Sequence, residues 1–524
     1  MMAKISKLQK SVAGGAIIIA LFSILSRLLG LFRDRLLSST FGAGQTLDAY
    51  YAAFRLPDLI FNTLILGALS SAFIPIFLKY WNKDKDEAWR ITNSVFNILF
   101  FLVLILALVA FIFAPLVVKY LVPGFEVETQ SLTISLTRIM LIGVLFFTCS
   151  NIASSVLNSF RKFLAYSLAP LMYNLGIIFG ILFLVPKTSL GLNGLAWGVV
   201  LGAAGHFLIQ LPSLLKVGYR WRPIIKSHPA IKRIITLMLP RCFGLAVSQL
   251  NFVVTTLIAS TITIGAVAIY SLAFNLFNVP VGVFGISLAI SIFPVLSKSF
   301  AIGDKKVFVS QLSKTICRIL YLIIPITAIY FSLRTQIVRL ILGAGVFSWR
   351  DTVLTANALG FFSISLLTQS LIPLFSKAFY ATNDTLTPVK IAVVSFIINI
   401  VGCLVLGPLI GVSGLALAFS LAGFVNLILL YYFFHKKAFP LPNKNIGNSF
   451  LRTVGLSLIM LIIIQLSKNL VGSLVDMQTF IGVSIQTVTA VMTGLLFYFV
   501  VSLFLRFPEM KIITQFLRKN KIKN

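Results

Sequence analysis

Ionisable side chains occur inside two long apolar stretches near the start of this chain, where each is costly to keep. The first stretch, residues 11–40, contains Arg27, Arg33, Asp34 and Arg35. An ionised group at the centre of a lipid bilayer costs about 2.5–3.5 kcal/mol on insertion scales. We therefore expect these groups to pair with one another, to face a polar cavity, or to extend to the membrane interface.

The second stretch, residues 47–79, carries Asp48, Arg55, Asp58 and Asn62. At about 100° per residue, Asp48 and Arg55 lie two turns apart on one helix face, and the other two lie beside them. Pro57 is expected to bend this stripe. The pattern predicts a polar face that points into the protein.

The chemistry of these groups favours an anionic ligand, because guanidinium groups donate in a planar fork that matches phosphate oxygens. Arg27 lies well inside its span without an acidic neighbour in the sequence, so we predict that it faces a cavity. Arg33 is expected either to pair with Asp34 or, through a kink at Gly30, to join Arg27. Arg35 is expected to extend to the interface.

The composition identifies the elements that must position these residues. The chain has 524 residues, of which 58% are hydrophobic and 11% charged, and its mean hydropathy is +1.00. A soluble domain is about half apolar and a quarter charged. The sequence therefore predicts an all-α polytopic membrane protein with about fourteen transmembrane helices, at 11–40, 47–79, 91–121, 130–159, 164–185, 190–216, 232–261, 264–297, 308–333, 352–381, 386–407, 412–435, 447–468 and 479–505.

The net charge of +31 comes from Lys and Arg gathered in alternate connections between the apolar stretches. This distribution is typical of topology determinants and argues against nucleic-acid binding, since no polar segment is long enough to form a binding domain. Both termini belong to the basic set, so we expect both to face the cytoplasm. The first apolar stretch is expected to be retained as a helix and not cleaved as a signal.

The sequence repeats itself at an offset of 219 or 220 positions, as in Pro75 and Pro294 or Gly191 and Gly411. The offset covers six spans, an even number, which predicts parallel repeats. We expect two pseudo-symmetric six-helix lobes, 1–220 and 221–440, around a central cavity, followed by two further helices and a basic cytoplasmic tail in 441–524.

The repeat also pairs the polar positions of the two lobes. Arg55 and Asp58 correspond to Asn275 and Asn278, so the first lobe supplies charges and the second supplies neutral amides. The predicted substrate-binding residues are Arg27, Arg33, Asp34, Asp48, Arg55, Asp58, Asn62, Asn275 and Asn278.

Other kinds of site lack support in the sequence. The four cysteines and three histidines are scattered without metal-ligand or redox spacing, and no nucleotide-binding loop occurs. We expect no catalytic residues, metal or cofactor, and therefore no enzyme.

Several segments resemble the MurJ/MviN lipid II flippase family of the multidrug/oligosaccharidyl-lipid/polysaccharide exporter superfamily. They include SRLLGLFRDRLLSSTFGAGQTLDAYYAAFRLPDL at 26–59, GALSSAFIPIF at 67–77 and KAFYATNDTLTPVKIA at 377–392. The resemblance runs in order through the first twelve predicted spans. By motif, Arg27, Arg33, Asp34 and Asp48 match cavity positions of the family, and Arg55 stands where the family usually has lysine.

The resemblance implies a protein of the bacterial plasma membrane that moves lipid II, an undecaprenyl-pyrophosphate-linked disaccharide peptide, from the inner to the outer leaflet by alternating access. We expect the protein to act as a monomer. The chain departs from the family where its usual cavity charges are replaced by Phe61, Asn62, Leu66 and Asn275. These departures leave two alternatives open: a flippase for another polyprenyl-linked oligosaccharide, and a cation-coupled drug exporter of the same superfamily.

Overall fold

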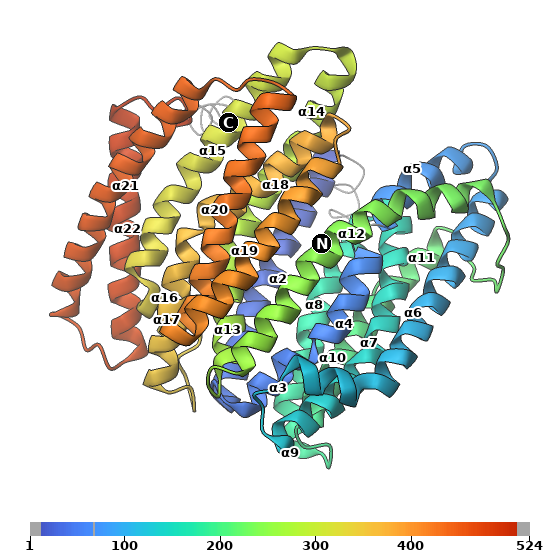
Figure 1. Cartoon of the computed structure of the whole chain (residues 1–524), viewed down its shortest axis with the longest axis horizontal. Helices are drawn as coiled ribbons and strands as arrows, with labels where there is room; N and C mark the ends of the chain where they lie inside the picture. The colour runs from blue at the N-terminus through green and yellow to red at the C-terminus, as the bar shows by residue number, and fades with distance from the viewer. Residues whose placement is uncertain (1–11, 67–68, 511–524) are drawn as a thin grey trace. The chain divides into compact units, whose positions relative to one another are not determined.

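Helices form all of the regular structure in residues 12–66 and 69–510, the part of the chain that the computed structural model describes (Figure 1). A bilayer offers no water to exposed amide groups, so a spanning segment must satisfy its own backbone hydrogen bonds. The apolar stretches become helices for this reason, as the sequence predicts. The basic residues before position 12 and the basic tail after 510 lie outside the described residues.

By its internal contacts the chain divides into two compact units, Met1–Ala268 with Ala344–Phe347, and Ile269–Gly343 with Ser348–Asn524. In the first unit, α7 packs against α3, α5, α6 and α10, and α8 packs against both α2 and α10. The helices of this unit are α2 (Val12–Phe41), α3 (Gln45–Ala53), α4 (Arg55–Phe61), the π-helical turn η1 (Asn62–Leu66), α5 (Leu69–Trp81), α6 (Lys85–Leu121), α7 (Val127–Ser159), α8 (Phe163–Phe179), the π-helical turn η2 (Gly180–Leu184), α9 (Val185–Lys187), α10 (Asn193–Leu208), α11 (Leu211–Lys216) and α12 (Pro229–Ser260).

In the second unit, α20 packs against α17, α18 and α19, while α21 packs against α15 and α22. The helices that make up this unit are α13 (Ala266–Pro280, from Ile269 onward), the π-helical turn η3 (Val281–Ile286), α14 (Ser287–Ile302), α15 (Lys305–Ser332), α16 (Arg334–Ile341), α17 (Trp349–Ile364), α18 (Leu366–Ala381), α19 (Leu386–Ile410), α20 (Val412–Lys437), α21 (Asn443–Gly472) and α22 (Phe480–Phe504). The predicted lobe boundaries at 220 and 440 stay a prediction.

Eleven helices in the described residues are long and apolar enough to cross a membrane, or twelve if α17 and α18, bent by 45°, form one span. These correspond to the last twelve of the fourteen predicted spans. The first predicted span, 11–40, becomes α2, which carries four charged side chains. The second, 47–79, is divided among α3, α4, η1 and α5, each of which is shorter than the roughly 20 residues that a span requires.

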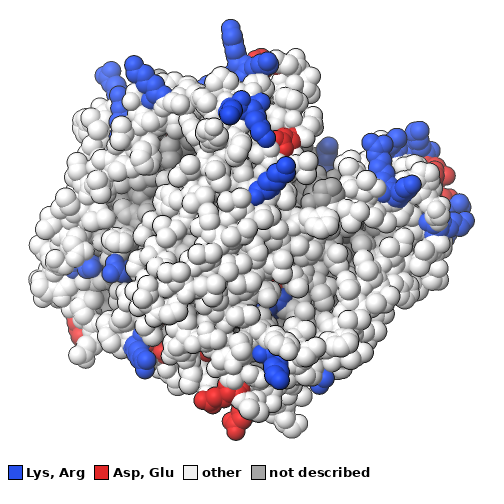
Figure 2. Space-filling model, viewed as in Figure 1, with Lys and Arg blue, Asp and Glu red and all other residues white. Residues whose placement is uncertain are grey.

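Apolar side chains remain exposed on the outer faces of the helices, as lipid requires. Ile112 on α6 is 65% exposed, and Leu409 on α19 is 72% exposed. In Figure 2 most of the visible face carries neither acidic nor basic side chains, and the charges gather in a few places. In water such a surface would be unstable, whereas in a bilayer it is the expected one.

The sequence repeat reappears as a repeat of local structure. The π-helical turn η1 begins at Asn62, and η3 begins 219 positions later, at Val281. The helix after each turn contains the matched prolines Pro75 and Pro294. A π-helical turn inside a helix is rare and often marks a functional position. Its recurrence at equivalent places indicates that both repeats keep the same interruption in the same helix.

Glycines allow α8 and α10 to approach closely. A Cβ atom added at Gly176 of α8 would lie 2.3 Å from Cα of Gly202, and one added at Gly202 would lie 2.5 Å from the carbonyl oxygen of Tyr173. Gly198 faces Gly180 in the same way, one turn along α10. Small residues at four-residue spacing are the usual means by which helices pack tightly in lipid.

We predict that Gly202→Ala lowers the melting temperature of the detergent-purified protein by several degrees, because backbone and not a flexible side chain occupies the space of the new methyl group. Gly455→Ala on α21 is the matched control, since no atom lies within 4 Å of its added Cβ and alanine favours the helix. Equal melting temperatures for the two variants would contradict the close packing of α8 and α10.

Candidate functional site

The centre of the candidate site is an ion pair within α2. The Nε and Nη2 atoms of Arg33 donate to Oδ1 of Asp34 at 3.0 and 2.7 Å. The Asp34 residue is 3% exposed, and the Arg33 side chain 19%. Two charges taken out of water are tolerated when they neutralise one another at such distances. Arg33 therefore pairs with Asp34, which is one of the two alternatives that the sequence predicts for it.

Asn174 connects this ion pair to α8. Nη1 of Arg33 donates to Oδ1 of Asn174 at 3.0 Å, and Nδ2 of Asn174 donates to the carbonyl oxygens of Ser26 and Pro170 at 3.3 and 3.1 Å. The guanidinium is thus held on two sides, by Asp34 in its own helix and by an amide in a neighbouring helix. Its direction is determined by packing between α2 and α8 rather than by rotamer preference alone.

A buried hydroxyl lies within electrostatic range of this pair. Tyr51 on α3 interacts with Asp34, Arg33 and Arg55. Its Oη atom is buried and has no hydrogen-bond partner in the part of the chain that the structure describes. An unsatisfied hydroxyl near charged groups is one that a polar ligand can satisfy.

A second set of polar contacts joins α4 and η1 to α12. Nε of Arg55 donates to Oγ1 of Thr256 at 2.7 Å, and the guanidinium carbon lies 5.5 Å from the centre of the Phe252 ring. Nδ2 of Asn62 donates to Oε1 of Gln249 at 3.3 Å. The three partners stand at i, i+3 and i+7 of α12 and therefore share one face of that helix.

Asp48 contacts the backbone at the start of α13 and not α12. Its oxygens accept hydrogen bonds from the backbone amides of Gly265 and Ala268 at 2.6 and 2.8 Å, and the residue is 1% exposed. Between Asp48 and Arg55 the helix is interrupted only at Phe54, whose dihedral angles stay helical (φ −70°, ψ −23°). The common face predicted for Asp48 and Arg55 stays a prediction.

The remaining predicted residues are partly exposed. Arg27 and Arg35 lie on α2 and Asp58 lies on α4, all of intermediate exposure. Arg27 precedes Arg33 by six residues, or about 9 Å along a helix. Asn275 and Asn278 lie on α13 in the second unit, where Nδ2 of Asn278 donates to the carbonyl oxygen of Phe274 at 2.9 Å.

Four contacting residues were missed by the sequence analysis: Asn174, Gln249, Phe252 and Thr256. A signal existed for three of them, because Asn174 is a lone amide in the apolar helix α8, and Gln249 and Thr256 are polar positions on one face of α12. Phe252 offers no such signal. In the described residues no group of three or more His, Cys, Asp or Glu side chains could hold a metal ion, and all four cysteines are free.

Membrane-spanning helices with a neutralised ion pair and amides held between them are the arrangement of a polytopic membrane transporter. The family model described as Lipid II flippase MurJ matches residues 37–485. The lipid II flippase MurJ of Burkholderia cenocepacia is 31% identical over 449 residues, which cover 84% of this chain and 87% of that protein. The chain belongs to the lipid II flippase MurJ family. This is a family of transporters and not of enzymes, as the sequence predicts.

Solved structures confirm the fold class. A structure of lipid II flippase MurJ in an inward closed conformation superposes with a TM-score of 0.78 at 28% identity, over 94% of this chain and 99% of that one. An inward-facing multidrug resistance MATE family transporter of the MOP superfamily gives a TM-score of 0.66 at 14% identity, over 84% and 98% of the two chains. The second likeness is one of fold alone.

We predict that Asp34→Asn lowers the free energy of unfolding by about 3 kcal/mol or more, because it leaves the Arg33 charge without its carboxylate. The double variant Arg33→Gln/Asp34→Asn is expected to lose less, since both charges are removed together. Unfolding in mixed micelles with increasing SDS measures the free energy of unfolding of each variant. Additive losses from Arg33→Gln and Asp34→Asn would contradict the neutralising role of the pair.

Proposed function

We propose that this protein translocates lipid II, the lipid-linked peptidoglycan precursor, from the inner to the outer leaflet of the plasma membrane by alternating access. The observation that carries the proposal is the family membership of the chain together with arginines kept inside its membrane helices. A lipid-linked pyrophosphate supplies the negative charge that such arginines can bind, and a pair of oxygens on one phosphate matches the planar guanidinium fork.

The residues of the first unit take distinct roles in this proposal. Arg27 binds the pyrophosphate directly, and Arg33 contributes through a guanidinium whose direction Asp34 and Asn174 determine. Arg55, Asn62 and Asp58 offer a second polar surface beside α12 for the head group. Asp48 acts as a positioning residue, since both of its oxygens accept backbone amides.

The second unit contributes neutral amides in the same proposal. Asn275 and Asn278 lie one turn apart on α13, in the stretch before η3. Amides suit sugar hydroxyls and peptide groups, because they donate and accept without adding charge. The π-helical turns η1 and η3 lie directly beyond these polar residues in each repeat, and we assign to them the bending that alternating access requires.

A second candidate function is favoured by one observation. Asn62 and Asn275 stand where the family usually has charged cavity residues, and Asn62 donates to Gln249. A cavity with fewer arginines suits a polyprenyl-pyrophosphate whose attached oligosaccharide lacks the acidic groups of a peptide stem. Complementation of a cell depleted of its lipid II flippase separates the two: growth supports lipid II as the substrate, and lysis despite normal protein level supports the other.

The proposed orientation places both termini in the cytoplasm and the protein acts as a monomer. The basic connections, including 220–233 between α11 and α12, then face the cytoplasm, while the acidic start of α7 with Glu126 and Glu128 faces outward. Lys and Arg resist translocation, whereas Asp and Glu contribute little to orientation.

We predict that a cysteine at Val127 reacts with a membrane-impermeant thiol reagent in intact cells, and that one at Lys226 reacts only after permeabilisation. Val127 is 81% exposed and Lys226 is also exposed, so reactivity reports sidedness rather than burial. The background variant has its four native cysteines replaced by alanine. The reverse pattern would overturn the orientation and the direction of transport.

We predict that Arg27→Ala abolishes complementation of the depleted cell while the protein is still made and inserted. A charge kept at a cost of a few kcal/mol is explained by the anion it binds. Arg27→Lys is expected to restore only part of the function, because an ammonium keeps the charge but lacks the fork.

Arg35→Ala is the matched control on the same helix and is expected to change little. Asn275→Arg is expected to be tolerated, since the family carries arginine there. Full function of Arg27→Ala at a normal protein level would contradict pyrophosphate binding. Loss of the protein itself would instead assign Arg27 a structural role.

A further inference from the structure

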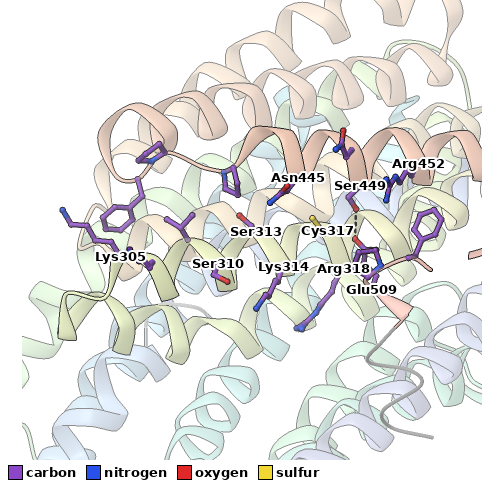
Figure 3. Close-up of a pocket in the computed structure, with 18 residues that line it drawn as sticks. Lys305, Ser310, Ser313, Lys314, Cys317, Arg318, Asn445, Ser449, Arg452 and Glu509 are labelled. Atoms are coloured by element: carbon purple, nitrogen blue, oxygen red, sulfur yellow. Dashed lines mark hydrogen bonds between the residues drawn. The ribbon is translucent and has the colours of Figure 1, made fainter. Parts of the chain in front are cut away.

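A basic pocket lies in the second unit and is lined by residues other than those discussed so far (Figure 3). It has a volume of about 1040 Å³ and is lined by the start of α15, the connection from α20 to α21, the start of α21, and the residues that follow α22. This volume is enough for a lipid headgroup and its glycerol and far exceeds that of a single phosphate.

One face of α15 supplies most of the polar wall. The lining residues recur in pairs at four-residue intervals, beginning with Lys305 and Lys306 and ending with Cys317 and Arg318. This spacing keeps all of them on one side of the helix over about 20 Å. In Figure 3 Ser313 and Cys317 of this row lie toward Asn445 and Ser449 of α21.

The charge of the pocket is strongly positive. Five cationic side chains line it against one carboxylate, that of Glu509; they are Lys305, Lys306, Lys314, Arg318 and Arg452. The starts of α15 and α21 add the partial positive charge of helix N-termini. An excess of this size in a concave site favours an anion.

Two buried polar atoms in the pocket lack partners in the described part of the chain. Ser313 is 7% exposed, and its Oγ makes no hydrogen bond. Glu509 accepts a hydrogen bond from Ser449 at 2.8 Å through Oε1, while its Oε2 is buried and unsatisfied. A phosphate oxygen can accept from the Ser313 hydroxyl, but the free carboxylate oxygen requires a donor. A ligand that satisfies both must carry a hydrogen-bond acceptor and a donor, and a phosphate with a hydroxyl group supplies the two.

The surroundings of the pocket favour a lipid as the source of that phosphate. Phe450 and Leu451, next to Ser449 and Arg452 on α21, are 37% and 67% exposed. Just before Phe507, which lines the pocket, Phe504 is 80% exposed. Exposed apolar side chains therefore neighbour the lining residues along the chain, as expected beside lipid. Basic pockets between transmembrane helices are known to bind anionic lipid headgroups.

We propose that this pocket binds the headgroup of an anionic glycerophospholipid, with the phosphodiester held by Lys314, Arg318 and Arg452 and a headgroup hydroxyl donating to Glu509. Phosphatidylglycerol has this chemistry. The site is separate from the proposed transport residues, and under the proposed orientation it faces the inner leaflet. Its occupancy does not depend on whether the protein moves lipid II.

The test uses the full-length protein in a neutral detergent, with thermal unfolding as the measure of binding. Dioctanoyl phosphatidylglycerol is titrated, with dioctanoyl phosphatidylcholine and inorganic phosphate as parallel probes. The wild-type protein is expected to gain melting temperature with phosphatidylglycerol alone. In Lys314→Gln/Arg318→Gln the apparent affinity is expected to fall about tenfold or more, because each cation near a lipid surface contributes substantially to binding.

Lys390→Gln/Lys436→Gln is the matched control, since it removes the same charge from exposed positions outside the pocket. It is expected to bind phosphatidylglycerol as the wild type does. Glu509→Gln is expected to reduce the preference for phosphatidylglycerol over dioctanoyl phosphatidic acid, which lacks the glycerol hydroxyls of the headgroup. Stabilisation by inorganic phosphate that the pocket variant loses would support an anion site with a soluble ligand as its source. Equal affinity of the pocket and control variants would overturn the proposal.

Discussion

A polar or charged group left unsatisfied among hydrocarbon has a high free-energy cost, and this cost determines much of the architecture. It explains why the described regular structure is entirely helical and why apolar side chains cover the outer faces. It also explains the arrangement around Arg33, whose guanidinium meets a carboxylate one residue away and an amide on α8. The close approach of α8 and α10 follows from the same constraint, because helices in lipid gain little from apolar burial and depend on packing and polar contacts.

The two repeats have similar backbones but carry different polar side chains at equivalent positions. Both contain a π-helical turn followed by a helix with a matched proline. The first carries Arg55 and Asp58 before its turn, and the second carries Asn275 and Asn278. Charges therefore need partners in the first unit, and α12 supplies Thr256 and Phe252 to Arg55. In the second unit, Nδ2 of Asn278 donates to the carbonyl oxygen of Phe274 in its own helix. The two repeats thus keep similar interrupted helices while one carries charges and the other neutral amides at equivalent positions.

The sequence predicts the helices and their order well, because hydropathy and the repeat are strong local signals. It predicts the Arg33–Asp34 pair as an alternative, since the two residues are neighbours. It cannot predict that Asn174 completes the pair, because 141 positions separate Asn174 from Arg33 and no periodicity relates two helices. The partners of Asp48 were also beyond the sequence, because its carboxylate accepts from the backbone amides of Gly265 and Ala268, more than 200 positions away. Pattern reasoning therefore succeeds within one helix and fails where contacts join separate helices. The basic face of α15 lies within one helix, and its four-residue pattern can be read from the sequence.

The balance of charge within α2 bears on how a transporter of this family can move. A unit charge carried across the full membrane potential requires or releases about 2.3 kcal/mol per 100 mV. Because Asp34 neutralises Arg33 inside the same helix, the pair adds no net charge when α2 shifts as a body. Any dependence of transport on the membrane potential must then arise from the other ionisable groups of the proposed site and from the charge of the bound lipid. The same neutrality lowers the cost of exposing the pair alternately to the two sides, since it needs no counter-ion from solution. A guanidinium held in a neutral pair is thus well suited to recognise an anion by geometry, whereas the headgroup site proposed in the second unit relies on an excess of cationic side chains.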